Sequence, residues 1–212
     1  MVDSQVLTFT WAAAALTMAP GADTMLVIRN VLRGGRRDGV ITTFGICAGL
    51  FVHATLSALG VSMLLMHSAT AFHLVKLAGA CYLGWLGFQS LRSAVRTPPP
   101  PDCVEEVEPT GGMAPQRCFL EGVLSNVLNP KTAVFYLAFL PQFIGPTDSV
   151  LTKSFLLASI HYVEGILWLV ALSIMLDHTR RFLLKSVVRR WLDGLCGAML
   201  VGFGARLALE RQ

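Results

Sequence analysis

Two short segments of the sequence combine a helix-breaking proline with side chains that can bind a polar solute. The first reads Pro-Gly-Ala-Asp-Thr at residues 20–24, and the second reads Asn-Val-Leu-Asn-Pro-Lys at residues 126–131. Proline removes a backbone donor and glycine loosens the helix beside it, so a break exposes backbone polar groups that can coordinate a solute inside a cavity. The residues of these segments that we predict to bind or couple a solute are Pro20, Gly21, Asp23, Thr24, Asn126, Asn129, Pro130 and Lys131.

Other ionisable side chains lie in apolar stretches elsewhere in the chain. His161 and Glu164 are three residues apart and so share one face of a helix, and His53 lies in an earlier stretch. Because histidine titrates near neutrality, these residues are candidates for a proton relay. The alternative for each histidine is a satisfied packing residue, and for His53 this alternative is favoured. For Asp23 the alternative is a helix cap, and for Lys131 it is a structural pair with Asp23.

The composition is that of a chain with a lipid-facing exterior. Of the 212 residues, 54% are hydrophobic and only 14% are charged, whereas about 25% are charged in a soluble domain. The basic residues lie in short loops between apolar runs, which excludes a nucleic-acid-binding module. The sequence has no His-Glu-x-x-His motif and no recognisable nucleophile–base pair, so we predict a protein that is not an enzyme and holds no metal or cofactor.

Six segments are long and apolar enough to cross a membrane, where a helix needs about 20 residues. We therefore predict an all-α membrane protein of six transmembrane helices, with the first and fourth helices broken at their prolines. Small residues at positions 45 and 49, 80 and 84, and 198 and 202 provide faces for close helix packing and permit a homodimer. The first apolar run has no cleavage site, so we expect a retained helix. The predicted spans are 5–28, 40–66, 69–91, 118–140, 150–176 and 191–209.

The charged loops give the orientation and the division of the chain. The loops after the first, third and fifth spans carry most of the Lys and Arg residues, whereas the intervening loops carry only Lys153. Since Lys and Arg prefer the cytoplasmic side, these three loops are predicted to be cytoplasmic and both termini outside. Residues 92–117 combine a proline run, an acidic stretch and a glycine pair, which is typical of a flexible linker. The segments 1–91 and 118–212 would then be two halves of three helices each, arranged as a 3+3 inverted repeat.

Four stretches of the chain resemble the lysine exporter (LysE/RhtB) family of amino-acid exporters, and together they cover almost its whole length. They are Pro-Gly-Ala-Asp at 20–23 with the basic loop and Gly39, the Gly-rich run at 76–87, the run from Gly122 through Asn-Pro-Lys to residue 143, and the segment 193–204. The resemblance implies export of amino acids or small derivatives across the bacterial plasma (inner) membrane, driven by the proton gradient. The family motif usually reads Pro-Gly-Pro, and here the third position is Ala22, so we expect a less rigid break.

Three hypotheses for the function stay open from the residues alone. In a proton-coupled exporter, Asp23 and Glu164 would handle protons, while Asn126, Asn129 and Lys131 would bind the ammonium and carboxylate groups of the substrate. A divalent metal-ion exporter would use oxygen and nitrogen ligands from the acidic residues and histidines. A membrane thiol-disulfide conduit would need paired reactive cysteines. The chain has five cysteines, an odd number without a Cys-x-x-Cys pair, which argues against a disulfide framework and favours packing.

Overall fold

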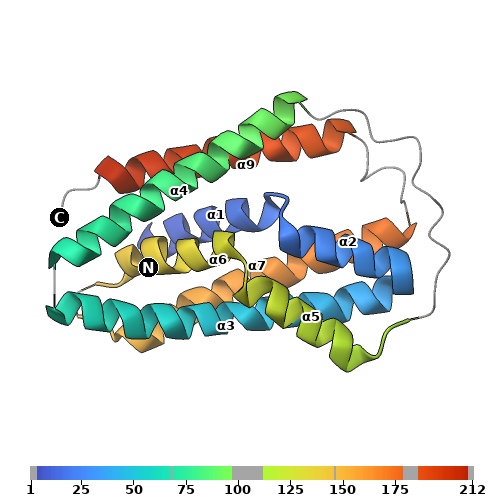
Figure 1. The fold of residues 1–212 in the computed structure, drawn as a ribbon, viewed down its shortest axis with the longest axis horizontal. Coiled ribbons are helices and arrows are strands. Elements are labelled where there is room, and N and C mark those ends of the chain that lie inside the picture. The colour runs from blue at the N-terminus through green and yellow to red at the C-terminus, as the bar shows by residue number, and fades with distance from the viewer. Residues whose placement is uncertain (1–3, 68, 97–111, 146, 179–185, 210–212) are drawn as a thin grey trace.

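The computed structural model describes residues 4–67, 69–96, 112–145, 147–178 and 186–209, with some side chains between residues 61 and 96 and between 186 and 209 outside this description. Within these ranges every regular element is a helix, and the long helices run roughly alongside one another (Figure 1). The elements are α1 (Ser4–Met18), α2 (Ala22–Gly34), α3 (Arg36–His67), α4 (Ala69–Arg96), α5 (Pro115–Val127), α6 (Pro130–Val134), the π-helical turn η1 (Phe135–Phe139), the 3-10 turn η2 (Leu140–Phe143), α7 (Val150–His178) and α9 (Ser186–Leu209).

The first and fourth predicted spans are broken helices. The α1–α2 pair bends by 50° around Pro20, and the pair formed by α5 and the segment Pro130–Phe143 bends by 51° at Asn129. Proline is tolerated at the first position of a helix because the backbone N–H there has no acceptor within the helix, so its absence costs no hydrogen bond. The second break therefore keeps Pro130 as the first residue of α6. Both prolines mark the places where a continuous helix is interrupted.

Two helices, α3 and α7, are each long and apolar enough to cross a membrane, and each bent pair passes the same test as one broken span. This gives up to four candidate spans by length and composition within the described residues. The remaining two predicted spans, 69–91 and 191–209, are helical as α4 and α9 but are not in this set. Six crossings and the 3+3 repeat therefore stay predictions.

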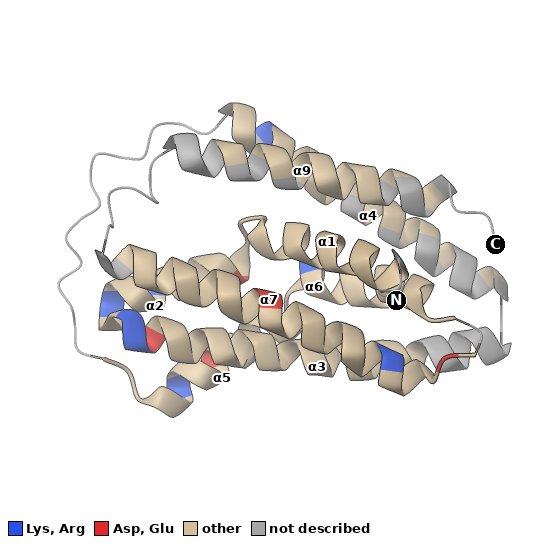
Figure 2. Ribbon diagram, turned by 180° about the vertical axis from the view of Figure 1, so that it is seen from behind, with Lys and Arg blue, Asp and Glu red and all other residues tan. Residues whose placement is uncertain are grey.

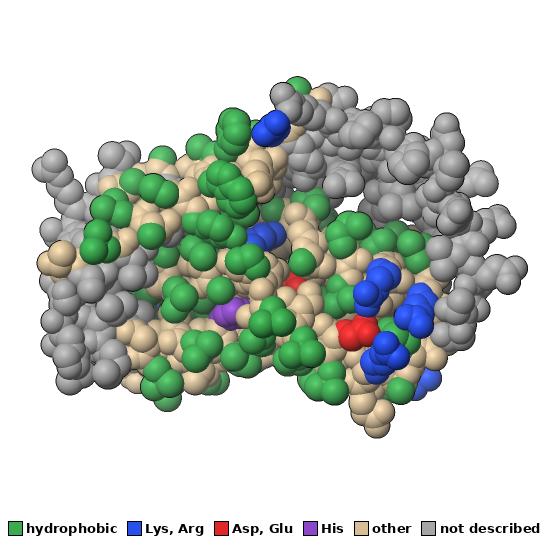
Figure 3. All heavy atoms as spheres, viewed as in Figure 1, with side chains coloured by type: hydrophobic (Ala, Val, Ile, Leu, Met, Phe, Trp, Pro, Cys, Tyr) green, Lys and Arg blue, Asp and Glu red, His purple; other side chains and the backbone are tan. Residues whose placement is uncertain are grey.

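The charged residues lie mainly at one end of the bundle, where α2 ends and α3 and α5 begin (Figures 2 and 3). Arg29 of α2 and Arg117 of α5 both pair with Glu121 there, with closest N–O distances of 2.6 and 3.3 Å. The opposite end carries Lys153 of α7, which pairs with Asp148. Arg29, at the start of the first predicted basic loop, and Arg117, at the end of the third, thus lie at one end of the bundle. The side of the membrane that this end faces stays a prediction.

The exterior between the two ends is apolar. Large hydrophobic side chains are exposed on the helices and spread over the face seen in Figure 3. Water-soluble proteins rarely expose contiguous apolar surface on this scale. The exposed residues include Trp11, Leu56, Leu59, Leu74, Phe88, Leu128, Leu167 and Trp191. This exterior agrees with the lipid-facing surface expected from the composition.

The core that supports the site consists of small residues of α1 and aromatic rings of the second broken helix. Ala12 and Ala13 are buried, so neighbouring helices approach α1 closely. The ring of Phe9 lies 5.7 Å from that of Phe135 and 5.5 Å from that of Phe143, between ring centroids. Such tilted and edge-on aromatic pairs are favourable beyond their burial. The beginning of α1 is thereby fixed against η1 and η2.

Close backbone approach occurs at only part of the predicted small-residue positions. At Gly45 and Gly49 of α3 an added Cβ would meet α5, and at Gly122 of α5 it would meet the backbone of α3. Gly84 and Gly202, in contrast, have open space within 4 Å, so their predicted role in close packing is wrong for the described residues. The α4–α9 contact is made instead at residues 87 and 197, where each glycine faces the carbonyl oxygen of the other. Spacing alone did not distinguish these helix faces.

The variant Gly122→Ala is expected to destabilise the fold. Its Cβ would collide with the Thr42 carbonyl oxygen and lie 2.8 Å from the Ile46 nitrogen, and backbone cannot move aside as a side chain can. Overpacking of this kind costs about 1–3 kcal/mol. The matched control Gly84→Ala, which meets nothing within 4 Å, should gain roughly 0.5–1 kcal/mol from the better helix residue. Thermal unfolding in detergent measures both, and equal midpoints would contradict the packing argument.

Candidate functional site

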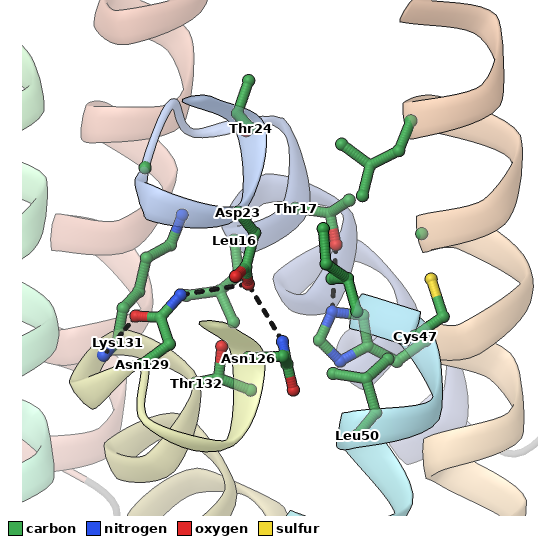
Figure 4. A pocket seen from close by; sticks show the side chains of 15 residues that line it. Leu16, Thr17, Asp23, Thr24, Cys47, Leu50, Asn126, Asn129, Lys131 and Thr132 are labelled. Atoms are coloured by element: carbon green, nitrogen blue, oxygen red, sulfur yellow. Dashed lines mark hydrogen bonds between the residues drawn. The ribbon is translucent and has the colours of Figure 1, made fainter. Parts of the chain in front are cut away.

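A small cavity lies where the two helix breaks meet α3 and α7. Its volume is about 50 Å³, enough for a few water molecules. Figure 4 shows Asp23 at its centre, with Asn129 and Lys131 on one side and Thr17, Cys47 and Leu50 on the other. The lining residues are Leu16, Thr17, Gly21, Asp23, Thr24, Ile46, Cys47, Leu50, Asn126, Asn129, Lys131, Thr132, His161, Gly165 and Leu169.

The two breaks place one charged residue each at the same position of the helix that follows. Gly21 caps α2, so Asp23 is its second residue, and Asn129 caps α6, so Lys131 is its second residue. The Asn129 side chain accepts a hydrogen bond of 3.0 Å from the Lys131 backbone nitrogen, which closes the first turn of α6. The breaks therefore carry opposite charges at matching positions.

The Asp23 carboxylate is held by three donors from the second broken helix. Its Oδ1 accepts a hydrogen bond of 2.7 Å from the Ser125 hydroxyl. Its Oδ2 accepts from the amide nitrogens of Asn126 and Asn129 at 2.9 and 3.0 Å. The carboxylate also lies at the positive N-terminal end of α2, which favours an anion. Asp23 thus joins the two breaks across a separation of more than 100 residues in the chain.

Lys131 makes the reciprocal connection to the first break. Its ammonium donates a hydrogen bond of 2.7 Å to the carbonyl oxygen of Ala19, which follows the last residue of α1. Carbonyl groups at a helix C-terminus carry partial negative charge and favour a cation. The Lys131 side chain passes beside Gly21, where an added Cβ would lie 3.6 Å from the ammonium, an ordinary van der Waals contact. Each break therefore holds the charged residue of the other.

Asn126 links the Asp23 carboxylate to a buried histidine. The backbone oxygen of Asn126 accepts a hydrogen bond of 2.9 Å from His53 Nε2. His53 is 4% exposed and does not line the cavity. The side-chain oxygen of Asn126 is buried and has no hydrogen-bond partner among the described residues. His53 therefore contacts the second break from outside the cavity.

His161 lines the cavity, whereas its predicted partner Glu164 does not. The ring of His161 forms hydrogen bonds through both nitrogens, at 2.9 Å with the Thr17 hydroxyl and at 3.2 Å with the Tyr136 hydroxyl. The Oε2 atom of Glu164 is buried and unpartnered within the described part of the chain. His161 and Glu164 share a helix, but the two side chains have different surroundings.

The structure gathers most of the predicted site residues around one cavity. Those that line it are Gly21, Asp23, Thr24, Asn126, Asn129, Lys131 and His161. Pro20, His53, Pro130 and Glu164 do not line it. Sequence reasoning missed Thr17, Ser125 and Tyr136, whose hydroxyl groups complete the hydrogen bonds. Hydroxyl residues are common in apolar helices, so no signal in the sequence singled out these three.

The structure gives no support to the two alternative chemistries. Among the described residues, no group of three or more His, Cys, Asp or Glu side chains is placed to hold a metal ion. Cys47, Cys81 and Cys118 are free thiols. The other two cysteine side chains, at positions 103 and 196, lie outside the described residues, as do those of His73 and Lys76.

The variant Ala22→Pro is expected to be tolerated and slightly stabilising. Ala22 is the first residue of α2, and the preceding Gly21 is extended with φ −159° and ψ −168°, which suits the residue before a proline. Proline at a compatible position gains about 0.4–1 kcal/mol. The control Met25→Pro removes the 3.0 Å hydrogen bond from Met25 to Gly21 and should cost about 3 kcal/mol. Thermal unfolding in detergent compares them, and a destabilised Ala22→Pro protein would contradict this account of the break.

An all-helical chain with an apolar exterior and a charged cavity between two broken helices has the architecture of a membrane transporter. The LysE type translocator model matches residues 14–211. The chain belongs to the LysE family, which consists of transporters and not of enzymes. The resemblance seen in the sequence motifs is thereby confirmed.

Several relatives align over nearly their whole length. The chain is 32% identical to the uncharacterized membrane protein YrhP of Bacillus subtilis (strain 168), covering 93% of this chain and 95% of the relative. It is 29% identical to a threonine efflux protein of Escherichia coli (strain K12), covering 92% of each. It is 26% identical to a homoserine/homoserine lactone efflux protein of Salmonella typhimurium (strain LT2), covering 97% of this chain and all of the relative. No solved structure matches the chain.

Proposed function

We propose that this protein exports small amino acids or close derivatives, with the cavity between the helix breaks as the solute site. The observation that carries the proposal is the opposite charge at the two breaks, Asp23 on one and Lys131 on the other. An amino acid is a zwitterion with the same two charges. The ammonium group of the substrate would replace the amide donors that now bond to Asp23. The carboxylate of the substrate would bind the Lys131 ammonium in place of the Ala19 carbonyl oxygen.

Relatives named for threonine and for homoserine efflux support small polar amino acids as the first substrates to test. Both are neutral zwitterions that carry a side-chain hydroxyl group. Asn126 and Asn129 would then contribute the amide groups that orient the bound backbone, as the sequence predicted. Thr24 lines the same cavity and would contact the substrate beside Gly21.

The site must open for transport, because a cavity of about 50 Å³ is too small for a whole amino acid. The bonds from Asp23 to Ser125, Asn126 and Asn129 would break as the two broken helices separate. We propose that the halves 1–91 and 118–212 form a 3+3 inverted repeat joined by the linker 92–117, and that they rock around this site. The nearly equal bends of 50° and 51° support such a repeat.

We also propose that export is driven by protons, with Asp23 and Glu164 as the proton-handling carboxylates. A carboxylate oxygen buried without a donor is costly when charged, and Glu164 Oε2 is in this situation. His161, which lines the cavity, and His53, which contacts the backbone of Asn126, complete the proposed set. Binding of a proton on the outer side and its release on the inner side would then return the carrier to its substrate-accepting state.

The orientation and assembly are part of the proposal. The arginine-rich end would face the cytoplasm of the bacterial cell, with both termini outside the inner membrane. Exposed small-residue faces would permit a homodimer in the bilayer.

The experiment is uptake of radiolabelled amino acids into inverted membrane vesicles, with and without a proton gradient. We expect uptake of at least one small amino acid above vesicles that lack the protein, and its loss when the gradient is collapsed. Divalent metal ions are added in a parallel arm. Metal uptake without amino-acid uptake would overturn the proposed function, and amino-acid uptake insensitive to the gradient would overturn the proton coupling.

A further inference from the structure

The cavity has two chemically different walls. One wall carries the charged groups Asp23 and Lys131. The wall beyond Asp23 carries Thr17, near the apolar side chain of Leu50 (Figure 4), and His161, which is hydrogen-bonded to Thr17. A zwitterionic backbone needs only the charged wall. The second wall therefore lies where a substrate side chain would extend.

The polar groups of this second wall hydrogen-bond to hydroxyl groups and not to charged side chains among the described residues. His161 is 4% exposed, and its two hydrogen-bond partners among the described residues are hydroxyl groups, those of Thr17 and Tyr136. A neutral imidazole has one donor and one acceptor nitrogen, and each hydroxyl can take either complementary role. The pair Thr17–His161 is thus a polar spot of matched, uncharged groups in an otherwise apolar wall.

The ring of His161 is held rigidly in this place. It stacks on the Tyr136 ring with centroids 5.8 Å apart and an angle of 14° between planes, and it meets Phe135 edge-on at 5.9 Å. The backbone oxygen of Tyr136 accepts a hydrogen bond of 2.7 Å from the Ser57 hydroxyl. Tyr136 is fully buried and does not line the cavity, so it acts as a positioning residue for His161.

A hydroxyl group suits this spot better than a methyl group or a charge. The Thr17 hydroxyl can keep its bond to His161 Nε2 and still use a second lone pair. A substrate alcohol that enters the spot could donate its O–H to this lone pair. A methyl group there has no donor for the spare lone pair of Thr17, so it forgoes the free energy of that hydrogen bond.

We propose that Thr17 and His161, positioned by Tyr136, form a hydroxyl-binding subsite that selects amino acids with a side-chain alcohol. This inference rests on the proposed export of amino acids and adds the chemical basis of substrate choice. It assigns His161 to recognition of a neutral group, and it gives Thr17 and Tyr136 a role that the spacing of residues did not reveal.

The test compares threonine with valine, which has the same shape but a methyl group in place of the hydroxyl. Uptake of each is measured in inverted vesicles as kcat/KM, and the ratio of the two is the readout. The wild-type protein should favour threonine about tenfold, the factor expected from one hydrogen bond. Thr17→Val should bring the ratio close to one while valine uptake continues. Tyr136→Phe should lower the ratio less, because it loosens the ring of His161 without removing it.

The matched control is Thr55→Val, which makes the same chemical change where the hydroxyl donates to the Phe51 carbonyl oxygen of its own helix, at 2.8 Å. Its ratio should equal that of the wild type. A wild-type ratio near one, or an unchanged ratio in both Thr17→Val and Tyr136→Phe, would overturn the subsite while leaving export itself intact. Failure of the wild-type protein to take up either amino acid would instead contradict the proposed function.

Discussion

In cells that carry Asp23→Asn, the rate of amino-acid efflux is expected to be at least about 30-fold lower than with the wild-type protein. This is the effect of removing one charged partner from a buried hydrogen-bonded pair. The substitution keeps the shape of the side chain but removes the negative charge that would hold the substrate ammonium. It also turns one acceptor into a donor, which would face a donor of Ser125, Asn126 or Asn129. Efflux of a preloaded amino acid, normalised to the amount of inserted protein, measures the effect.

The matched control for this change is Asp148→Asn, at the opposite end of the bundle. Asp148 accepts a hydrogen bond from the Gly145 nitrogen and pairs with Lys153 at 3.6 Å, away from the cavity. This variant should export at close to the wild-type rate. Normal efflux through well-expressed Asp23→Asn protein would remove Asp23 from the mechanism.

Replacement of Lys131 by alanine should lower the export rate to a similar extent, by about 30-fold or more. The change removes the cation proposed for the substrate carboxylate and leaves the Ala19 carbonyl without the 2.7 Å bond from the Lys131 ammonium. Lys131→Met keeps most of the length of the side chain, so it separates the loss of charge from the loss of packing. Both variants are measured in inverted vesicles with the best substrate of the panel.

Two comparisons distinguish substrate binding from a purely structural role of Lys131. Lys153→Ala removes a lysine that pairs with Asp148 outside the cavity, and it should leave uptake nearly unchanged. The amide of the best substrate lacks the carboxylate, so its uptake should fall less than that of the parent amino acid in Lys131→Met. Equal losses for the acid and its amide would contradict a contact between Lys131 and the carboxylate.

The helices and their breaks were predictable because they depend on local properties of the chain. Apolar runs of about 20 residues predict spans whatever lies next to them. Pro20 and Pro130 interrupt a helix through their own rings and their missing donors. The bends at both places, of 50° and 51°, are therefore consequences of local sequence. The same holds for the placement of one charge just after each break.

The partners of these charges were decided by tertiary structure. Asp23 meets the Asn126 and Asn129 amides, as their shared face allowed, but its bond to Ser125 was not foreseen. Lys131 reaches the Ala19 carbonyl, although the sequence pointed only to Asp23 as its partner. Such contacts join residues more than 100 positions apart, and they depend on the rotation and height of packed helices. Spacing along one helix does not carry this information.

The sequence by itself thus determined an all-helical chain of the LysE family with two broken helices and one charged residue after each break. Only the tertiary structure decided that these breaks meet at one cavity, that Glu164 lies outside it, and that Thr17 and Tyr136 enclose His161. The physical reason is that a helix and its breaks are set by nearest neighbours in the chain, whereas a site is set by the register in which helices pack. That register follows from side-chain shape and close glycine contacts such as those at Gly49 and Gly122.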